Sequence, residues 1–148
     1  MRTKPFDIAM IGHFAKDKIV FGDTSRIASG GAVYCGSIAL ARLGYRVAVI
    51  TKLQKGDFPL LDELREAGIE VFAKEAVETS GMENIYFTQD RDKRVCKPLG
   101  FVGAFEESEI PDVEAKAFLA AAVTSLKMEV PGPFTGTVEN VEMLLQDS

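Results

Sequence analysis

Short apolar segments alternate with helical segments through the first half of the chain, and this alternation constrains the fold most. Residues 6–11 and 47–51 are short apolar runs. Such runs are typical of strands buried on both faces of a parallel sheet. Apolar and small residues recur at helical spacing over residues 32–43 and 57–67. With a further apolar segment at 69–72, the order predicts an α/β fold with right-handed crossovers.

Local signals mark the ends of the two predicted helices. Gly44 and Gly68 stand at the C′ positions, where glycine adopts the left-handed conformation that ends a helix. Asp57 is the predicted N-cap of the second helix, with Pro59 in its first turn. These signals predict compact connections between the elements.

Two segments outside this alternation predict short strands. Residues 18–21 alternate polar and apolar side chains before a turn at Gly22-Asp23, and residues 25–28 return as a second strand. Residues 85–88 and 94–97 form another pair of short strands around a turn-prone acidic and basic tip. The tip, residues 90–94, is either a solvated hairpin end or an arginine clamp for phosphate.

The tail predicts two helices separated by a break. The first begins at Pro111, continues through the alanines at 120–122 and ends near Met128. Pro131-Gly132-Pro133 cannot be helical. Thr137 is the predicted cap of the second helix, whose apolar face consists of Val138, Val141, Leu144 and Leu145.

Composition excludes several classes of protein. The 148 residues fit a single domain, and a net charge of −5 without a basic cluster argues against nucleic-acid binding. No apolar run approaches the ~20 residues of a membrane span. Cys35 and Cys96 have no metal-ligand spacing, so we expect reduced thiols in a cytoplasmic protein. His13 is the sole histidine, so a metal site or a catalytic triad is not expected.

Several features follow one another along residues 6–110. They are the opening strand from Phe6 to Gly12, then Asp17, Ser29-Gly30-Gly31 before a small-residue helix, Gly56-Asp57-Phe58 after a strand, and Glu66-Ala67-Gly68-Ile69 at a corner. In this order they resemble the start of ribokinase-like, or PfkB-type, sugar and nucleoside kinases. The resemblance implies a three-layer parallel sheet with a small β lid formed by residues 17–28 and 84–98.

The resemblance resumes in the tail after an interruption. Residues 120–128 and 131–145 look like the last two helices of the family, so we expect C-terminal helices over about 111–146 and a junction near Phe118-Leu119. The family's Gly-Ala-Gly-Asp motif, which supplies the catalytic base and anion hole, does not occur in the 148 residues; the nearest string is Gly103-Ala104-Phe105. The sequence therefore predicts a truncated ribokinase-like domain without a catalytic residue.

Asp17 and the Gly30-Gly31 pair are the first candidates for a binding site. A carboxylate near the carboxyl end of a parallel strand can accept two hydroxyl hydrogen bonds, and glycines before a helix let a ligand approach the first-turn N–H groups. On residues alone, Asp17 could be a solvated turn residue and the glycines simple loop punctuation. The resemblance implies that all three contact a sugar or nucleoside.

The other candidates are His13, Tyr34 and Asn84. His13 lies at the mouth of the first strand, Tyr34 could stack on a base or sugar, and Asn84 could face substrate from the lid. Each could instead pack structurally. The family usually has an asparagine where this chain has Cys35, and this departure bears on the identity of the substrate.

Three functional hypotheses follow. By descent the chain is a kinase that transfers the γ-phosphate of ATP, with Mg²⁺, to a sugar or nucleoside hydroxyl. Without the catalytic motif it could be a non-catalytic binding module for such a small molecule, or an engineered minimal fragment of the fold. A homodimer through the lid or an exposed sheet face is expected under each of these hypotheses.

Overall fold

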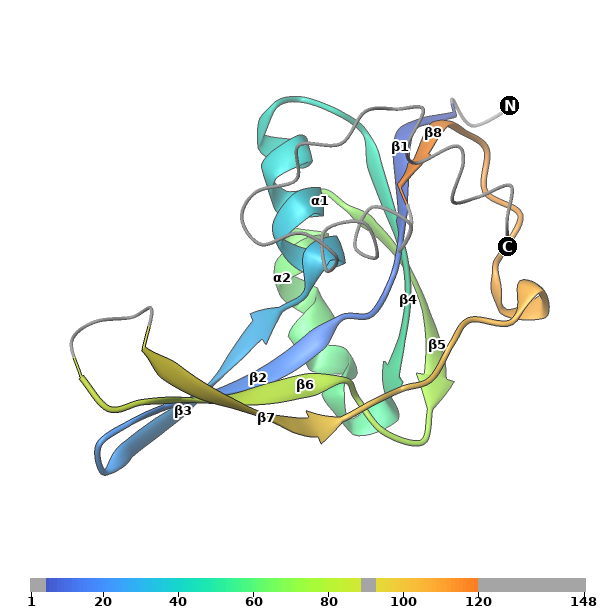
Figure 1. Ribbon diagram of the computed structural model, residues 1–148. Helices are drawn as coiled ribbons and strands as arrows, with labels where there is room; N and C mark the ends of the chain where they lie inside the picture. The colour runs from blue at the N-terminus through green and yellow to red at the C-terminus, as the bar shows by residue number, and fades with distance from the viewer. Residues whose placement is uncertain (1–4, 89–92, 120–148) are drawn as a thin grey trace, which may run out of the picture.

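The computed structural model describes residues 5–88 and 93–119, which form two four-stranded sheets (Figure 1). The first sheet is entirely parallel, with the order β5-β4-β1-β8. Its strands are β1 (Phe6–Ile11), β4 (Val47–Gln54), β5 (Glu70–Ala76) and β8 (Ala115–Leu119). The α/β class and the parallel sheet predicted from the sequence are therefore confirmed.

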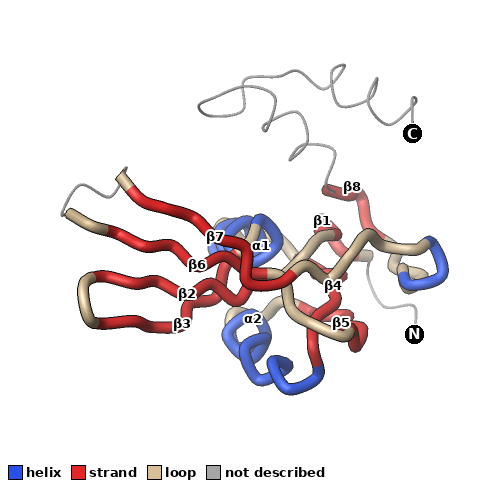
Figure 2. Tube along the Cα trace, turned by 60° about the horizontal axis from the view of Figure 1, so that its bottom comes forward, coloured by secondary structure: helices blue, strands red, loops and turns tan. Residues whose placement is uncertain are grey.

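The second sheet, here called the lid sheet, projects from the carboxyl ends of β1 and β5 (Figure 2). Its order is β3-β2-β6-β7; β2 and β6 are parallel and the other two pairs antiparallel. The strands are β2 (Ala15–Phe21), β3 (Thr24–Gly30), β6 (Gly81–Tyr86) and β7 (Arg94–Gly100). They contain most of the two segments predicted as short lid strands.

Two helices cover one face of the parallel sheet, and an irregular segment crosses the other. The helices are α1 (Ala32–Arg42) and α2 (Asp62–Glu66), and between β4 and α2 lies the 3-10 helix η1 (Lys55–Leu61). Residues 101–114, here called the strap, contain the short 3-10 helix η2 (Glu107–Glu109) and lead from β7 to β8. Figure 1 shows α1 and α2 on the opposite side of the parallel sheet from the strap.

The core lies between the parallel sheet and its two helices. Alternate residues of β4 point toward the helices, where they meet apolar side chains of α1, η1 and α2. The buried members include Val33, Val47, Val49, Leu53, Leu61 and Leu64. No helix in the described ranges is long and apolar enough to cross a membrane.

The helix predicted to begin at Pro111 is wrong over its described part. Residues 115–119 form β8, which pairs in parallel with β1 in the register Phe6↔Ala115 and Met10↔Leu119. Pairing satisfies the backbone groups along the free edge of β1, and this outweighs the weak helix preference of alanine-rich sequence. Phe118 and Leu119, expected at a junction, lie within this strand. The rest of that helix and the helix predicted after Thr137 lie outside the described residues.

The predicted N-cap at Asp57 is also wrong. This segment starts as η1, whose cap residue Gln54 makes no side-chain capping bond, and only the last five helical residues are α-helical. The Asp57 carboxylate instead accepts hydrogen bonds from Lys16 and Thr79. The C′ glycines were predicted correctly, since Gly44 and Gly68 have φ of 89° and 79°.

Truncation of Leu53 tests where the core lies. Its side chain is fully buried between β4 and the helices, so Leu53→Ala should lower the free energy of unfolding by about 2–5 kcal/mol. Val77 is 94% exposed, so Val77→Ala should change it by less than about 0.5 kcal/mol. Urea unfolding of the two variants measures both values, and equal values would contradict this account of the core.

Candidate functional site

Asp17 and Gly30 meet where the lid sheet joins α1. Asp17 lies on β2, and its Oδ1 accepts a hydrogen bond of 2.8 Å from the backbone N–H of Met82 on β6. A Cβ added at Gly30 would lie 2.7 Å from Oδ2 of the same carboxylate. Glycine at this position therefore lets the Asp17 carboxylate stand directly beside the end of β3.

Gly31 turns the chain from β3 into α1. Its φ of 90° is in the left-handed region, and a Cβ here would lie 2.6 Å from the backbone oxygen of His13. Gly31 is the N-cap of α1, so the first-turn N–H groups of that helix begin next to Asp17 and Gly30. The structure thus brings Asp17, Gly30 and Gly31 together as one candidate site with an acceptor carboxylate and backbone donors.

One face of the lid sheet continues this site. Side chains alternate along β2, so Asp17 and Ile19 share a face, and Ile19 is in register with Asn84 on β6. Asn84 is in register with Cys96 on β7, and the Cys96 thiol donates to Asn84 Oδ1 at 3.1 Å. We call the side that carries Asp17, Asn84 and Cys96 the Asp17 face.

The opposite face of the lid sheet carries different chemistry. The Lys18 and Glu83 side chains pair there at 2.9 Å, which agrees with the alternation along β2 and β6. Lys97 is in register with Glu83 and so shares that side. The two faces therefore differ: the Asp17 face carries the Asn84–Cys96 pair, and Arg94 Nε donates to the Cys96 sulfur at 3.4 Å.

The His13 imidazole is engaged within the protein. Nε2 lies 2.8 Å from the Gly103 oxygen and Nδ1 lies 3.2 Å from the Ser80 hydroxyl. Phe101 packs edge-on to the ring and Phe105 stacks on it, with centroids at 5.4 Å and 5.7 Å. Burial lowers the pKa of His13 below its usual value; the Gly103 bond opposes this shift and the nearby Lys52 adds to it. These contacts match the structural alternative for His13.

Tyr34 lies outside the Asp17 face. Its hydroxyl donates to the Glu63 carboxylate on α2, and its ring packs edge-on against Phe14 with centroids 5.8 Å apart. The bond to Glu63, followed by burial, raises the pKa of Tyr34 to about 12. Tyr34 thus contributes to the contact between α1 and α2.

An ion pair that sequence reasoning missed ties the lid sheet to the end of β4. Lys16 Nζ lies 2.6 Å from Asp57 Oδ1, and the Thr79 hydroxyl donates to Oδ2 at 2.7 Å. Burial opposes the charged form of Asp57, but the bonds from Lys16 and Thr79 outweigh it and hold the pKa below its usual range. The only sequence signal was a lysine next to Asp17.

A second missed ion pair holds the strap on the parallel sheet. Lys52 is 6% exposed, and its ammonium donates to the Ala104 oxygen at 2.5 Å and to Glu109 at 2.8 Å. Lys74 on β5 also pairs with Glu109, at 3.3 Å. The Lys52 bond, with a backbone bond from Glu106, lowers the pKa of Glu109 to about 2. A lysine inside an apolar strand was the signal for this pair.

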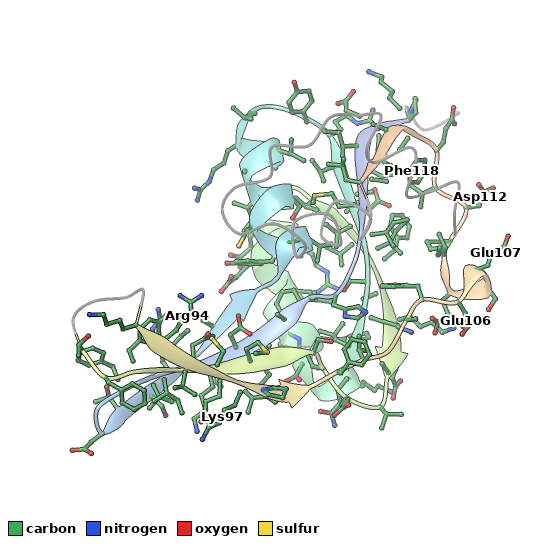
Figure 3. The ribbon with its side chains drawn as sticks, viewed as in Figure 1. Arg94, Lys97, Glu106, Glu107, Asp112 and Phe118 are labelled. Carbon is green, nitrogen blue, oxygen red and sulfur yellow. The ribbon has the colours of Figure 1, made fainter. Side chains whose placement is uncertain are left out.

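The charged side chains labelled in Figure 3 differ in sign between lid strand β7 and the strap. Figure 3 shows Arg94 and Lys97 on lid strand β7, whereas Glu106, Glu107 and Asp112 lie on the strap. Within the described ranges, no three His, Cys, Asp or Glu side chains form a group that could hold a metal ion. The strap carboxylates thus do not contribute to the Asp17 face.

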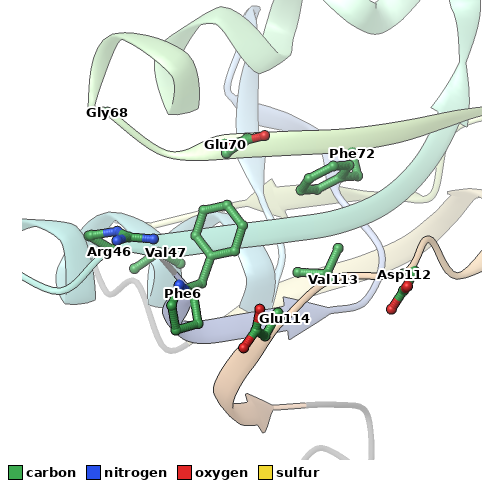
Figure 4. Close-up of a pocket in the computed structure, with 10 residues that line it drawn as sticks. Phe6, Arg46, Val47, Gly68, Glu70, Phe72, Asp112, Val113 and Glu114 are labelled. Carbon is green, nitrogen blue, oxygen red and sulfur yellow. The ribbon is translucent and has the colours of Figure 1, made fainter. Parts of the chain in front are cut away.

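A cavity of about 760 Å³ lies away from the Asp17 face (Figure 4). Its lining comes from the amino ends of the parallel strands and the strap, and includes Phe6, Arg46, Val47, Glu70, Phe72 and Val113. Ligands of open parallel sheets gather at the carboxyl ends of the strands. The Asp17 face lies at that end and this cavity does not.

The described structure is thus an α/β fold in which a β lid stands at the carboxyl edge of a parallel sheet and a carboxylate lies beside the glycine-led start of α1. No protein-family model matches the chain, and neither does any curated protein. Among solved structures, it matches a pyrophosphate-dependent kinase in the ribokinase family at 34% identity and TM-score 0.66, over 75% of this chain and 39% of that one. The resemblance to ribokinase-like kinases is therefore confirmed.

Two other solved structures add to this comparison. One is a pyrophosphate-dependent myo-inositol-1 kinase converted into a myo-inositol-3 kinase by an asparagine-to-leucine and a serine-to-leucine substitution; it is 29% identical over 76% of this chain and 37% of its own, with TM-score 0.64. The other is a ribokinase from Cryptococcus neoformans var. grubii in complex with ADP, which at 12% identity, TM-score 0.65, and 84% and 45% coverage shows the shared fold alone. The chain spans about two fifths of the length of the first relative.

Substitution of Gly31 tests the close approach at the helix start. Gly31→Ala should lower the free energy of unfolding by more than Gly44→Ala, because both residues have positive φ but only Gly31 has a backbone oxygen within 2.6 Å of the added Cβ. We expect about 1 kcal/mol for Gly44→Ala and at least about 2 kcal/mol for Gly31→Ala, measured by urea unfolding. Equal losses would show that Gly31 is not sterically constrained.

Proposed function

We propose that this chain forms the acceptor-binding part of a phosphotransferase whose acceptor is a polyol, either a sugar or a cyclitol. The observation that carries the proposal is the Asp17 carboxylate held beside Gly30 at the start of α1. A carboxylate accepts hydrogen bonds from neighbouring hydroxyl groups, and the first-turn N–H groups of a helix donate to their oxygens. Together these groups match a vicinal diol.

The nature of the acceptor is supported by the relatives. The myo-inositol kinase acts on a cyclitol, and the other relative, at 34% identity, is likewise a pyrophosphate-dependent kinase. A polyol needs several hydrogen-bonding groups and little apolar surface, which agrees with the polar Asn84–Cys96 pair on the Asp17 face. A nucleoside acceptor is the alternative. It would require a stacking surface, and Tyr86, two residues from Asn84 on the Asp17 face, is the candidate for it.

The Asn84–Cys96 pair is our candidate for choosing which hydroxyl reacts. In the relative, replacing one asparagine and one serine by leucine changes the phosphorylated position of myo-inositol. Here an asparagine and a cysteine, which has the shape of a serine with sulfur for oxygen, are hydrogen-bonded on the Asp17 face. A weaker thiol donor in that place would hold the acceptor less firmly than a hydroxyl.

The donor is pyrophosphate or ATP, and the 148 residues are proposed not to transfer phosphate by themselves. Phosphoryl transfer requires an oriented nucleophile and positioned charge on the transferred group. The sequence contains no Gly-Ala-Gly-Asp string, and the described residues offer no acidic cluster for Mg²⁺. Losing such groups costs orders of magnitude in rate.

Isothermal titration calorimetry with myo-inositol and a panel of sugars tests the acceptor site. Asp17→Asn should weaken polyol binding by about 10- to 100-fold, because a charged acceptor is lost from the site. Asp23→Asn, in the exposed turn between β2 and β3, is the matched control and should leave affinity unchanged. Saturable binding without transfer of phosphate from pyrophosphate or ATP–Mg²⁺ to the polyol is the expected result. Cooperative unfolding without any ligand-induced stabilisation would instead favour a purely structural fragment.

Thiol labelling tests whether Cys96 faces the acceptor. In a Cys35→Ser background, saturating myo-inositol should slow iodoacetamide labelling of Cys96 several-fold, measured by mass spectrometry. The control is Lys97→Cys with both native cysteines replaced by serine, which puts the thiol on the opposite face of the same strand. Equal protection of both thiols, or of neither, while calorimetry shows binding would refute the assignment of Cys96.

A further inference from the structure

Four chain segments connect the lid sheet with the rest of the structure, and all four meet at His13. His13 itself lies in the first connection, between β1 and β2. The second connection, from β3 to α1, brings Gly31 against the His13 backbone oxygen. The third contains Ser80, just before β6, and the fourth contains Gly103, just after β7; their polar atoms lie at the two ring nitrogens. A single side chain thus joins segments far apart in the sequence.

The hydrogen-bond directions around the ring follow from its partners. The Gly103 carbonyl can only accept, so Nε2 carries the proton and donates to it. Nδ1 is then the acceptor for the Ser80 hydroxyl proton. The Ser80 oxygen in turn accepts the backbone N–H of Val102 at 3.0 Å. Ser80 is buried, so this chain of bonds from Val102 through Ser80 to His13 has little access to water.

A proton at Nδ1 would break this arrangement. Protonated Nδ1 becomes a donor and can no longer accept the Ser80 hydroxyl proton, so that hydroxyl would have to turn away inside a buried site. The new charge would lie between Phe101 and Phe105. It would also lie near the Lys52 ammonium, which is 5.1 Å from the Phe105 ring centroid.

The charged groups on the surrounding elements already have other partners. Glu78, in the β5–β6 connection, accepts the backbone N–H of Phe101. Lys52 on β4 is the group that acts on His13 electrostatically, and its ammonium is already paired with Glu109 of η2. Lys16 on β2 is paired with Asp57 of η1. Among the described residues, the hydrogen-bond partners of the imidazole nitrogens are a carbonyl and a hydroxyl, not a carboxylate.

We propose that His13 is a positioning residue that fastens the lid sheet to the parallel sheet, and that protonation of its Nδ1 releases Ser80 and loosens the lid. The acceptor site needs the Asp17 face held over Gly30, so its affinity for a polyol should follow the same protonation; this consequence rests on the proposed function. The role of His13 in fastening the lid does not rest on the proposed function, because its contacts are present whether or not the chain binds a polyol.

The direction in which stability should change with pH follows from the depressed pKa of His13. The unfolded chain would take up a proton near pH 6.5, and the folded chain only at lower pH. The stabilisation from the neutral junction is therefore fully present above pH 6.5 and is lost as pH falls through the folded pKa. Loosening of the lid should occur over that same range.

NMR of the 148-residue chain tests the proposal, because the sequence contains one histidine and its ring signal needs no assignment. The His13 ring should titrate below pH 6.5. Hydrogen exchange of the Val102 amide and of β6 and β7, corrected for the intrinsic pH dependence of exchange, should accelerate through the same titration. A ring that titrates at or above pH 6.5, or protection of Val102 that does not change through the titration, would overturn the proposal.

The variant His13→Gln separates the protonation of His13 from other effects of low pH on the protein. Glutamine can still donate to Gly103 but cannot be protonated, so its lid protection should be independent of pH between 7.5 and 5.5. If the variant fails to fold, the titration of the unaltered chain remains decisive. Polyol calorimetry at both pH values then distinguishes the two proposals. If hydrogen exchange in the lid depends on pH but no polyol binds, the proposal about His13 stands and the proposed acceptor site is refuted.

Discussion

The close approach of the β3–α1 turn to the β1–β2 connection is the constraint on which the rest of the structure depends. Gly31 adopts a left-handed conformation against the His13 carbonyl, and Gly30 leaves room for the Asp17 carboxylate. Side chains at these two positions would separate the lid sheet from the start of α1. The backbone donors of that helix and the carboxylate of β2 can share one site only because both residues lack a Cβ.

Two ion pairs near the β3–α1 turn and the strap connect segments that are far apart in the sequence. Lys16 and Asp57 tie the lid sheet to η1, and Lys52 and Glu109 tie the strap to β4. Breaking one partner of a mostly buried pair leaves the other charge uncompensated, which is costly. The two pairs therefore join the lid sheet and the strap to the parallel sheet and its flanking elements. The apolar core beneath α1 and α2 supplies the driving force for folding.

The sequence predicted the regular part of the fold because its patterns are local. Apolar runs and C′ glycines indicated β1, β4, β5 and the carboxyl ends of both helices, and the structure brings Asp17, Gly30 and Gly31 close together. Features that depend on tertiary contacts were missed. β8 was predicted as a helix because its partner, the edge of β1, is more than a hundred residues away in the sequence. The N-cap prediction at Asp57 fails for the same reason, because its partner Lys16 lies 41 residues earlier.

The most direct test of the acceptor site is a crystal structure of this chain with saturating myo-inositol. The account predicts a ring hydroxyl within hydrogen-bonding distance of the Asp17 carboxylate, next to Gly30 and below the Asn84–Cys96 pair. A cyclitol bound elsewhere, for instance in the cavity lined by Phe6 and Phe72, or no bound cyclitol at all, would contradict it.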